Sequence, residues 1–235
     1  MIVRVSLSAI AKPIRVGAAI LLAGMAFATP ASAESPLVVK KTEPGVHRMG
    51  GPQAEVTLTE YVSYTCPHCA HFEADSGDAL RLVYVGSGRM ALEVRHLVRD
   101  PVDLTAAMLT NCGPVGRFDR NHVMFMRSQK EWLGKIQSAS QAQKNRYATG
   151  PYSTRRQAIA RDAGFYEMML KRGYSRTDID KCLADETLAR KLSEMTMSYT
   201  KDRGVTGTPS FEINGVLLAG THDWDSLKPQ LDVRF

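Results

Sequence analysis

A stretch of about one hundred residues without strand signals, lying between two segments that have them, constrains the fold most strongly. In the first segment the sequence EVTLTEYV alternates between two faces, with Val56, Glu60 and Val62 on one of them, which is typical of a strand. A helical stretch from Pro67 to about Val85 follows, and then a second alternating stretch, RMALEVRHLV. This order predicts a β-α-β unit whose domain is interrupted by a helical insertion.

Helical patterns dominate from Asp103 to Arg203, so we predict an all-helical insertion over these residues. The clearest helix covers 186–203, with Asp185 as its N-cap and Gly204 as its end. Shorter helices are expected at Thr105–Asn111, Arg120–Lys135 and Arg155–Asp162.

Strand signals return after the insertion. Ser210–Ile213 and Val216–Ala219 flank Asn214-Gly215, which is a strong signal for a two-residue hairpin turn. A short helix should follow Asp223, limited or distorted by Pro229. The predicted organisation is a signal peptide at 1–33, a polar lead-in at 34–53, the two parts of an α/β domain at 54–102 and 204–235, and the helical insertion at 103–203.

The first 33 residues have the features of a cleavable export signal. Basic residues precede an apolar run at 16–27, which is too short to span a membrane comfortably, and the segment closes on Ala31-Ser32-Ala33. It supplies three positive charges of the formal +6, so the mature chain would carry +3. No dense basic run interleaved with aromatics is present, which argues against a nucleic-acid partner.

Two of the four cysteines, Cys66 and Cys69, lie three residues apart where a helix should begin. Pro67 suits the first helical position, which leaves Cys66 at the N-terminal cap. There the helix dipole and free N–H groups favour a thiolate, and His68 can add positive charge or a hydrogen bond. Cys69, one turn deeper, should be less exposed. A structural zinc site would need further ligands, and only His71 is close in sequence, so we favour a redox pair without metal.

The sequence EYVSYTCPHC resembles the active-site region of DsbA-type thiol–disulfide oxidoreductases of the thioredoxin superfamily. That family has a buried Glu six residues before the first cysteine, and Glu60 matches it. From the alternation alone, an exposed or edge position for Glu60 is favoured over a buried carboxylate with a raised pKa. The resemblance covers residues from about 54 onward and implies a thioredoxin fold with an inserted helical domain.

The resemblance also implies a cis-proline loop in GVTGTPSFEING, with Pro209 beside the cysteines and Thr208 before it. Thr208 would offer its backbone to an extended substrate peptide, in a manner similar to strand addition. Without the resemblance, a trans proline that starts a strand is favoured. The best-known oxidases of the family have Val before this proline, whereas Thr is more familiar in isomerases and reductases. The isomerases usually carry a dimerisation domain, for which residues 34–53 are too short.

The other two cysteines, Cys112 and Cys182, fall within the predicted insertion. An oxidising compartment and an even cysteine count favour a structural disulfide between them, and two buried free thiols are the alternative. The histidines His47, His96, His122 and His222 are scattered in sequence, so we expect each at the surface or in the core rather than in a ligand set.

The resulting hypothesis is a periplasmic oxidoreductase, which we expect to be monomeric, that oxidises unfolded or partly folded exported proteins with free cysteines. Cys66 would carry the mixed disulfide with the substrate, and Glu60 would relay protons near Cys69. No cofactor is expected beyond the cysteine pair itself, and a membrane redox partner would reoxidise it. A reductase or isomerase, or a non-catalytic metal- or peptide-binding protein, are the alternatives.

Overall fold

The computed structural model describes residue 2 and residues 38–235. The expected signal peptide therefore lies outside the described residues, apart from position 2. Within the described part of the chain, no helix is long and apolar enough to cross a membrane.

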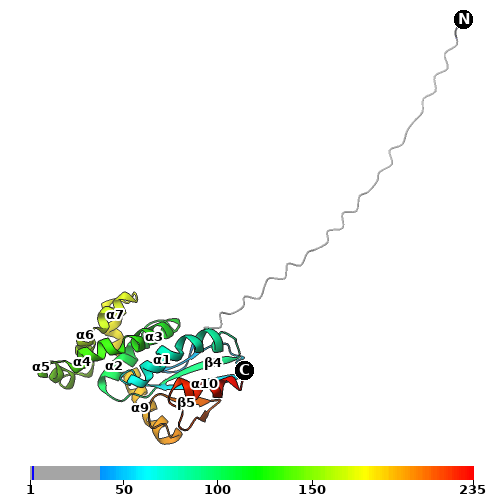
Figure 1. Ribbon diagram of the computed structural model, residues 1–235. Helices are drawn as coiled ribbons and strands as arrows, with labels where there is room; N and C mark the ends of the chain where they lie inside the picture. The colour runs from blue at the N-terminus through cyan, green and yellow to red at the C-terminus, as the bar shows by residue number, and fades with distance from the viewer. Residues whose placement is uncertain (1, 3–37) are drawn as a thin grey trace. The chain divides into compact units, whose positions relative to one another are not determined.

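The strands form a six-stranded mixed sheet with the order β1-β2-β4-β3-β5-β6. Two of its strands, β4 and β5, are labelled in Figure 1. Its central strand β3 runs parallel to β4, and helix α1 with the π-helix η1 connects the two, which confirms the predicted β-α-β unit. All other neighbouring strands are antiparallel. The elements are β1 (Val39–Glu43), β2 (Val46–Met49), β3 (Val56–Val62), α1 (Pro67–Ala79), η1 (Leu80–Val85), β4 (Met90–His96), β5 (Ser210–Ile213) and β6 (Val216–Leu217).

Strands β1 and β2 were missed, because residues 34–53 were predicted to be only a polar lead-in. β1 is the end strand of the sheet and leaves most of its side chains in solvent, so it has no apolar alternation. β2 is only four residues long and buries a histidine, His47, between Val46 and Met49. A turn at Gly45, where φ is 84°, joins the two strands.

Eight α-helices lie between β4 and β5 in the described chain, where the sequence analysis placed the insertion (Figure 1). The expected helix Arg120–Lys135 is instead two helices, because Ser128 leaves helical geometry and its hydroxyl donates to Met124 O at 2.6 Å. The last helix begins at the side-chain cap of Asp185 and ends at Gly204, as predicted. The eight are α2 (Pro101–Thr110), α3 (Phe118–Arg127), α4 (Gln129–Gln137), α5 (Gln141–Ala148), α6 (Tyr152–Ala163), α7 (Phe165–Lys171), α8 (Arg176–Leu183) and α9 (Glu186–Arg203).

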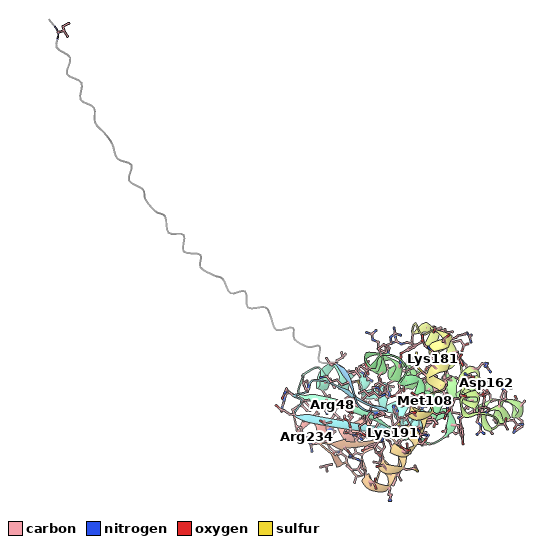
Figure 2. The ribbon with its side chains drawn as sticks, turned by 180° about the vertical axis from the view of Figure 1, so that it is seen from behind. Arg48, Met108, Asp162, Lys181, Lys191 and Arg234 are labelled. Carbon is pink, nitrogen blue, oxygen red and sulfur yellow. A yellow bond between two sulfur atoms is a disulfide. The ribbon has the colours of Figure 1, made fainter. Side chains whose placement is uncertain are left out.

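One continuous apolar cluster joins the sheet to the helical part. It includes Leu92 of the sheet, Phe72 of α1, and Met108 and Phe125 of the helical part. In Figure 2, Met108 lies between the sheet region marked by Arg48 and the helices marked by Asp162 and Lys181. Through this shared core, Gln129 of the helical part reaches the loop that precedes α1 and donates to Tyr64 O.

The C-terminal hairpin is shorter than expected, since β6 ends at Leu217 rather than Ala219. The final helix α10 (Trp224–Asp232) begins at the side-chain cap of Asp223 and continues through Pro229 to its end. Its buried Leu227 and Leu231 pack into the shared core.

Candidate active site

Cys66 occupies the N-cap of α1, with Pro67 at the start of the helix. Both motif cysteines are buried, Cys66 being 3% and Cys69 0% exposed, and they are not bonded to each other. In its thiol form Cys66 Sγ donates to Thr208 O at 3.1 Å. Hydrogen bonding from the Cys69 thiol lowers the pKa of Cys66 to about 4, against the effect of burial. The site therefore favours a thiolate at Cys66 near neutral pH.

Cys69 has the opposite environment. Burial raises the pKa of the Cys69 thiol well above its ordinary value, and the neighbouring Cys66 raises it further. The two sulfurs thus differ in their protonation: Cys66 is suited to attack and to leave, and Cys69 keeps its proton until a base takes it.

His68 is exposed beside the cysteines. Its backbone N–H contributes to lowering the pKa of the Cys66 thiol. Among the side-chain hydrogen bonds in the described chain, none joins the His68 imidazole to Cys66, so a direct role of that ring stays a prediction.

Glu60 lies in the central strand β3, where it pairs with Val94 on one side and Phe211 on the other. It is 4% exposed, so the exposed or edge position that the alternation favoured is wrong. The alternation could not reveal this, because residues on both faces of β3 are covered. Burial raises the pKa of Glu60 to about 8, and the Glu73 carboxylate adds to the rise. A carboxyl group with this pKa can exchange a proton near neutral pH.

The peptide bond between Thr208 and Pro209 is cis. Its loop leads directly into β5, where Ser210 pairs with Tyr61 of β3, so the loop lies against the end of the central strand. His222 fixes the loop from the other side, since its Nδ1–H donates to Pro209 O at 2.8 Å. Thr208 and Cys66, 142 residues apart in the chain, are thereby brought into contact.

Three side chains that the sequence analysis did not assign to the site hold the loop before Cys66. Asp103 accepts from Ser63 Oγ at 2.6 Å and from Tyr64 N at 2.7 Å, and Asp100 accepts from Thr65 Oγ1 at 2.6 Å. The buried Gln129 of α4 donates from Nε2 to the carbonyl oxygens of Tyr64 and Cys66, both at 2.7 Å.

A sequence signal exists for one of these side chains. Asp100 precedes a proline and caps α2 by accepting from Val102 N and Asp103 N, which is a recognisable helix start. Burial raises the pKa of Asp103 to about 7. No local pattern marks Gln129, because its partners are 63 and 65 residues away.

Three of the histidines that are scattered in sequence meet in the fold. The His47 ring stacks on Phe118 with 3.6 Å between centroids, and His96 and His122 contact the same Phe118 at 6.0 and 5.7 Å. All three are buried, and burial lowers the pKa of His47 to about 3 and that of His96 to about 4. Within the described residues, no group of three or more His, Cys, Asp or Glu side chains is placed to hold a metal ion.

Cys112 and Cys182 form a disulfide between the end of α2 and helix α8, with 5.6 Å between their Cα atoms. The bond spans 70 residues of the helical part, and Cys112 belongs to the shared core. A structural role for this disulfide remains a prediction.

Comparison with known proteins places this geometry in a family. The model of the thioredoxin family matches residues 41–233. The crystal structure of protein-disulfide isomerase from Novosphingobium aromaticivorans is similar, with a TM-score of 0.77 and 49% identity over 81% of this chain and 97% of that chain. Wolbachia pipientis alpha-DsbA1 has a similar fold, with a TM-score of 0.64 and 20% identity over 85% of this chain and 94% of that chain.

A curated relative extends the comparison. The Rickettsia typhi protein named "Putative protein-disulfide oxidoreductase" is 28% identical over 169 residues, which are 72% of this chain. The chain spans about half of that relative, 54% of its length. Family match and fold agree: the chain belongs to the thioredoxin family and has the fold of the DsbA-type thiol–disulfide oxidoreductases.

Proposed function

We propose that the protein is an exported thiol–disulfide oxidoreductase that donates the Cys66–Cys69 disulfide to newly secreted proteins in the periplasm. The observation that supports this most is the position of Cys66 at the N-cap of α1, with a pKa lowered to about 4 and its sulfur 3.1 Å from Thr208 O. A stable Cys66 thiolate favours the reduced pair, and a pair that favours its reduced form is an oxidant.

The reaction proceeds through two exchanges. A substrate thiolate attacks Cys66 Sγ of the disulfide, forming a mixed disulfide and releasing Cys69 as a thiolate, which takes up a proton. A second substrate thiolate then attacks the substrate sulfur of the mixed disulfide and releases Cys66 as a stable thiolate. The substrate loses two electrons and two protons, and the pair gains the electrons. Glu60, with a pKa of about 8, supplies or accepts the proton at Cys69.

The remaining parts of the proposal concern partners. Thr208 and Pro209 align an extended substrate segment beside Cys66, since the Thr208 carbonyl is directed at its sulfur. The chain works as a monomer, needs no cofactor beyond the cysteine pair, and is reoxidised by a membrane protein that carries its own disulfide.

Disulfide isomerisation is the second candidate. It is favoured by the 49% identical structure, which is that of a protein named protein-disulfide isomerase, and by Thr at position 208. An isomerase needs the pair reduced, so that Cys66 attacks a wrong substrate disulfide and a correct one forms without net oxidation.

The redox potential of Cys66–Cys69 against glutathione separates the two. A potential well above that of the glutathione couple supports the oxidase, and one near that of thioredoxin contradicts it. Oxidation of a reduced, unfolded protein and reshuffling of a scrambled one should be compared in the same samples. Cys66→Ala is the control, because it should abolish both activities, whereas peptide holding without turnover would persist.

A further inference from the structure

A groove of about 620 Å³ lies beside the active site, between α1 and the α3–α4 pair. Pro67, which follows Cys66 directly, lines its near end. Gln129, whose side chain donates to Cys66 O, belongs to its wall. One end of the groove is therefore formed by the residue next to the reacting cysteine, and the cis-proline loop contacts that cysteine through Thr208 O.

Small side chains leave the groove open. Ala70 and Ala74 of α1 and Gly134 of α4 line it, and Met126 and Leu133 supply apolar surface. A Cβ atom added at Gly134 would meet no atom within 4 Å. Glycine inside a helix is unfavourable relative to other residues, so its use here needs a reason, and open space for a ligand is one.

The groove has apolar walls and two basic side chains, of which one lacks an ion-pair partner in the described chain. Arg127 and Lys130 both line it. Arg127 is paired with Asp78 at 2.6 Å and with Glu73 at 3.5 Å, whereas Lys130 has no carboxylate within 4.0 Å among the ion pairs of the described residues. An occupant with an apolar side chain and a nearby carboxylate would match both features.

We propose that this groove binds the part of the substrate polypeptide that continues past the reacting cysteine, with preference for an apolar residue followed by an acidic one. The proposal rests on the proposed function. We expect a chain that pairs with the backbone at Thr208 and brings its cysteine to Cys66 Sγ to continue toward Pro67, which lines one end of the groove. Backbone pairing at Thr208 does not depend on the substrate's side chains, whereas the groove would select substrates by the side chains that enter it.

Gly134→Leu tests the proposal, because leucine fills the groove without touching the cysteines. Gly116→Leu is the matched control: Gly116 lies in the 3₁₀ turn η2 (Val115–Arg117), outside the groove, and an added Cβ there also meets nothing within 4 Å. The substrates are reduced peptides with two cysteines. In one peptide Leu-Asp directly precedes the first cysteine, and in a second peptide it directly follows that cysteine. Each has a permuted partner of the same composition, in which Leu-Asp is moved seven residues away.

We expect wild-type protein and Gly116→Leu to oxidise one adjacent Leu-Asp peptide with a KM about tenfold lower than that of its permuted partner, as for one buried apolar side chain. Gly134→Leu should abolish this difference. Lys130→Glu should have a lower KM for the peptide in which Lys replaces Asp than for the original Leu-Asp peptide.

Equal KM values for the adjacent and permuted peptides, or an unchanged preference in Gly134→Leu, would overturn the proposal. Exchange with dithiothreitol, which is too small to fill the groove, separates this failure from failure of the proposed function: if wild-type protein does not exchange with it, the redox activity itself is refuted. Dissociation of a wild-type dimer by Gly134→Leu in sedimentation would assign the groove to a second copy of the chain instead.

Discussion

The Cys66 thiolate makes the stability of the reduced protein depend on pH. The pKa of Cys66 is lowered from 9.0 to about 4 in the folded protein. A group whose pKa is depressed by folding adds stability that is complete above the unfolded pKa and is lost as pH falls through the folded one. At pH 7 the reduced form should therefore gain about 4 kcal/mol from this thiolate, and at pH 5 only about 1.4 kcal/mol.

The oxidised protein provides the reference for this prediction. Its cysteines are bonded and do not titrate, while its other buried groups respond to pH in nearly the same way. The loss between pH 7 and pH 5 should thus appear as a decrease of about 3 kcal/mol in the stability of the reduced protein relative to the oxidised one. The 4 kcal/mol at pH 7 corresponds to a redox potential about 90 mV above that of a pair with an ordinary thiol.

Urea unfolding of both redox forms at pH 5, 6 and 7 measures the difference, and thiolate absorbance locates the pKa independently. Reduced Cys66→Ala, compared with the oxidised wild type, should show no such slope. If the reduced-minus-oxidised difference of the wild type is the same at pH 5 and pH 7, the inference of a stabilised Cys66 thiolate is wrong.

Four further predictions concern groups around the site. Burial raises the pKa of Glu60 to about 8, so ionisation of this carboxyl group increasingly disfavours folding as pH rises. Glu60→Gln should therefore raise the free energy of unfolding by about 3 kcal/mol at pH 7 but not at pH 4.5. An equal effect at both pH values would contradict this. Replacing Cys112 and Cys182 by Ala opens a loop that spans 70 residues and should cost about 4 kcal/mol in urea unfolding; no loss would show that the bond does not constrain the unfolded chain. The pKa of His47 is lowered to about 3, so the wild type loses stability as pH falls below 6.5, whereas His47→Phe does not. Between pH 7 and pH 5 the free energy of unfolding of His47→Phe should therefore rise by about 2 kcal/mol relative to that of the wild type. Parallel pH profiles would refute a neutral buried ring. Gln129→Ala leaves two buried carbonyls without their donor and should cost about 1–3 kcal/mol, whereas wild-type stability would show that water replaces the amide.

The local features of the site could be predicted from the sequence. Proline after Cys66 fixed the helix start, alternation located β3 and β4, and Asn214-Gly215 located the hairpin, because each depends on neighbours within a few residues. The resemblance to a family then supplied the cis bond at Pro209, which no local pattern of residues would reveal.

Features that depend on distant contacts could not be predicted in this way. Glu60 has the alternation of a half-exposed strand, and only the strands on both sides and the covered faces make it buried. Likewise, His47, His96 and His122 share Phe118 although up to 75 positions separate the histidines in sequence. Such groupings are set by tertiary packing, which the periodicity of apolar residues along the chain does not predict.

The proposed function would bring the protein into contact with unfolded chains, and the end strands of the sheet bear on whether such chains can add to it. β1 presents Lys40 and Lys41 on exposed positions, and its pairing is irregular between Lys41 and Glu43. At the opposite end of the described sheet, β6 is only two residues long. Charged, bulged or very short edges resist the addition of another strand. Extended polypeptides are thus discouraged from adding at both ends of the sheet, and the backbone at Thr208 is where we propose that a substrate chain pairs next to the cysteines.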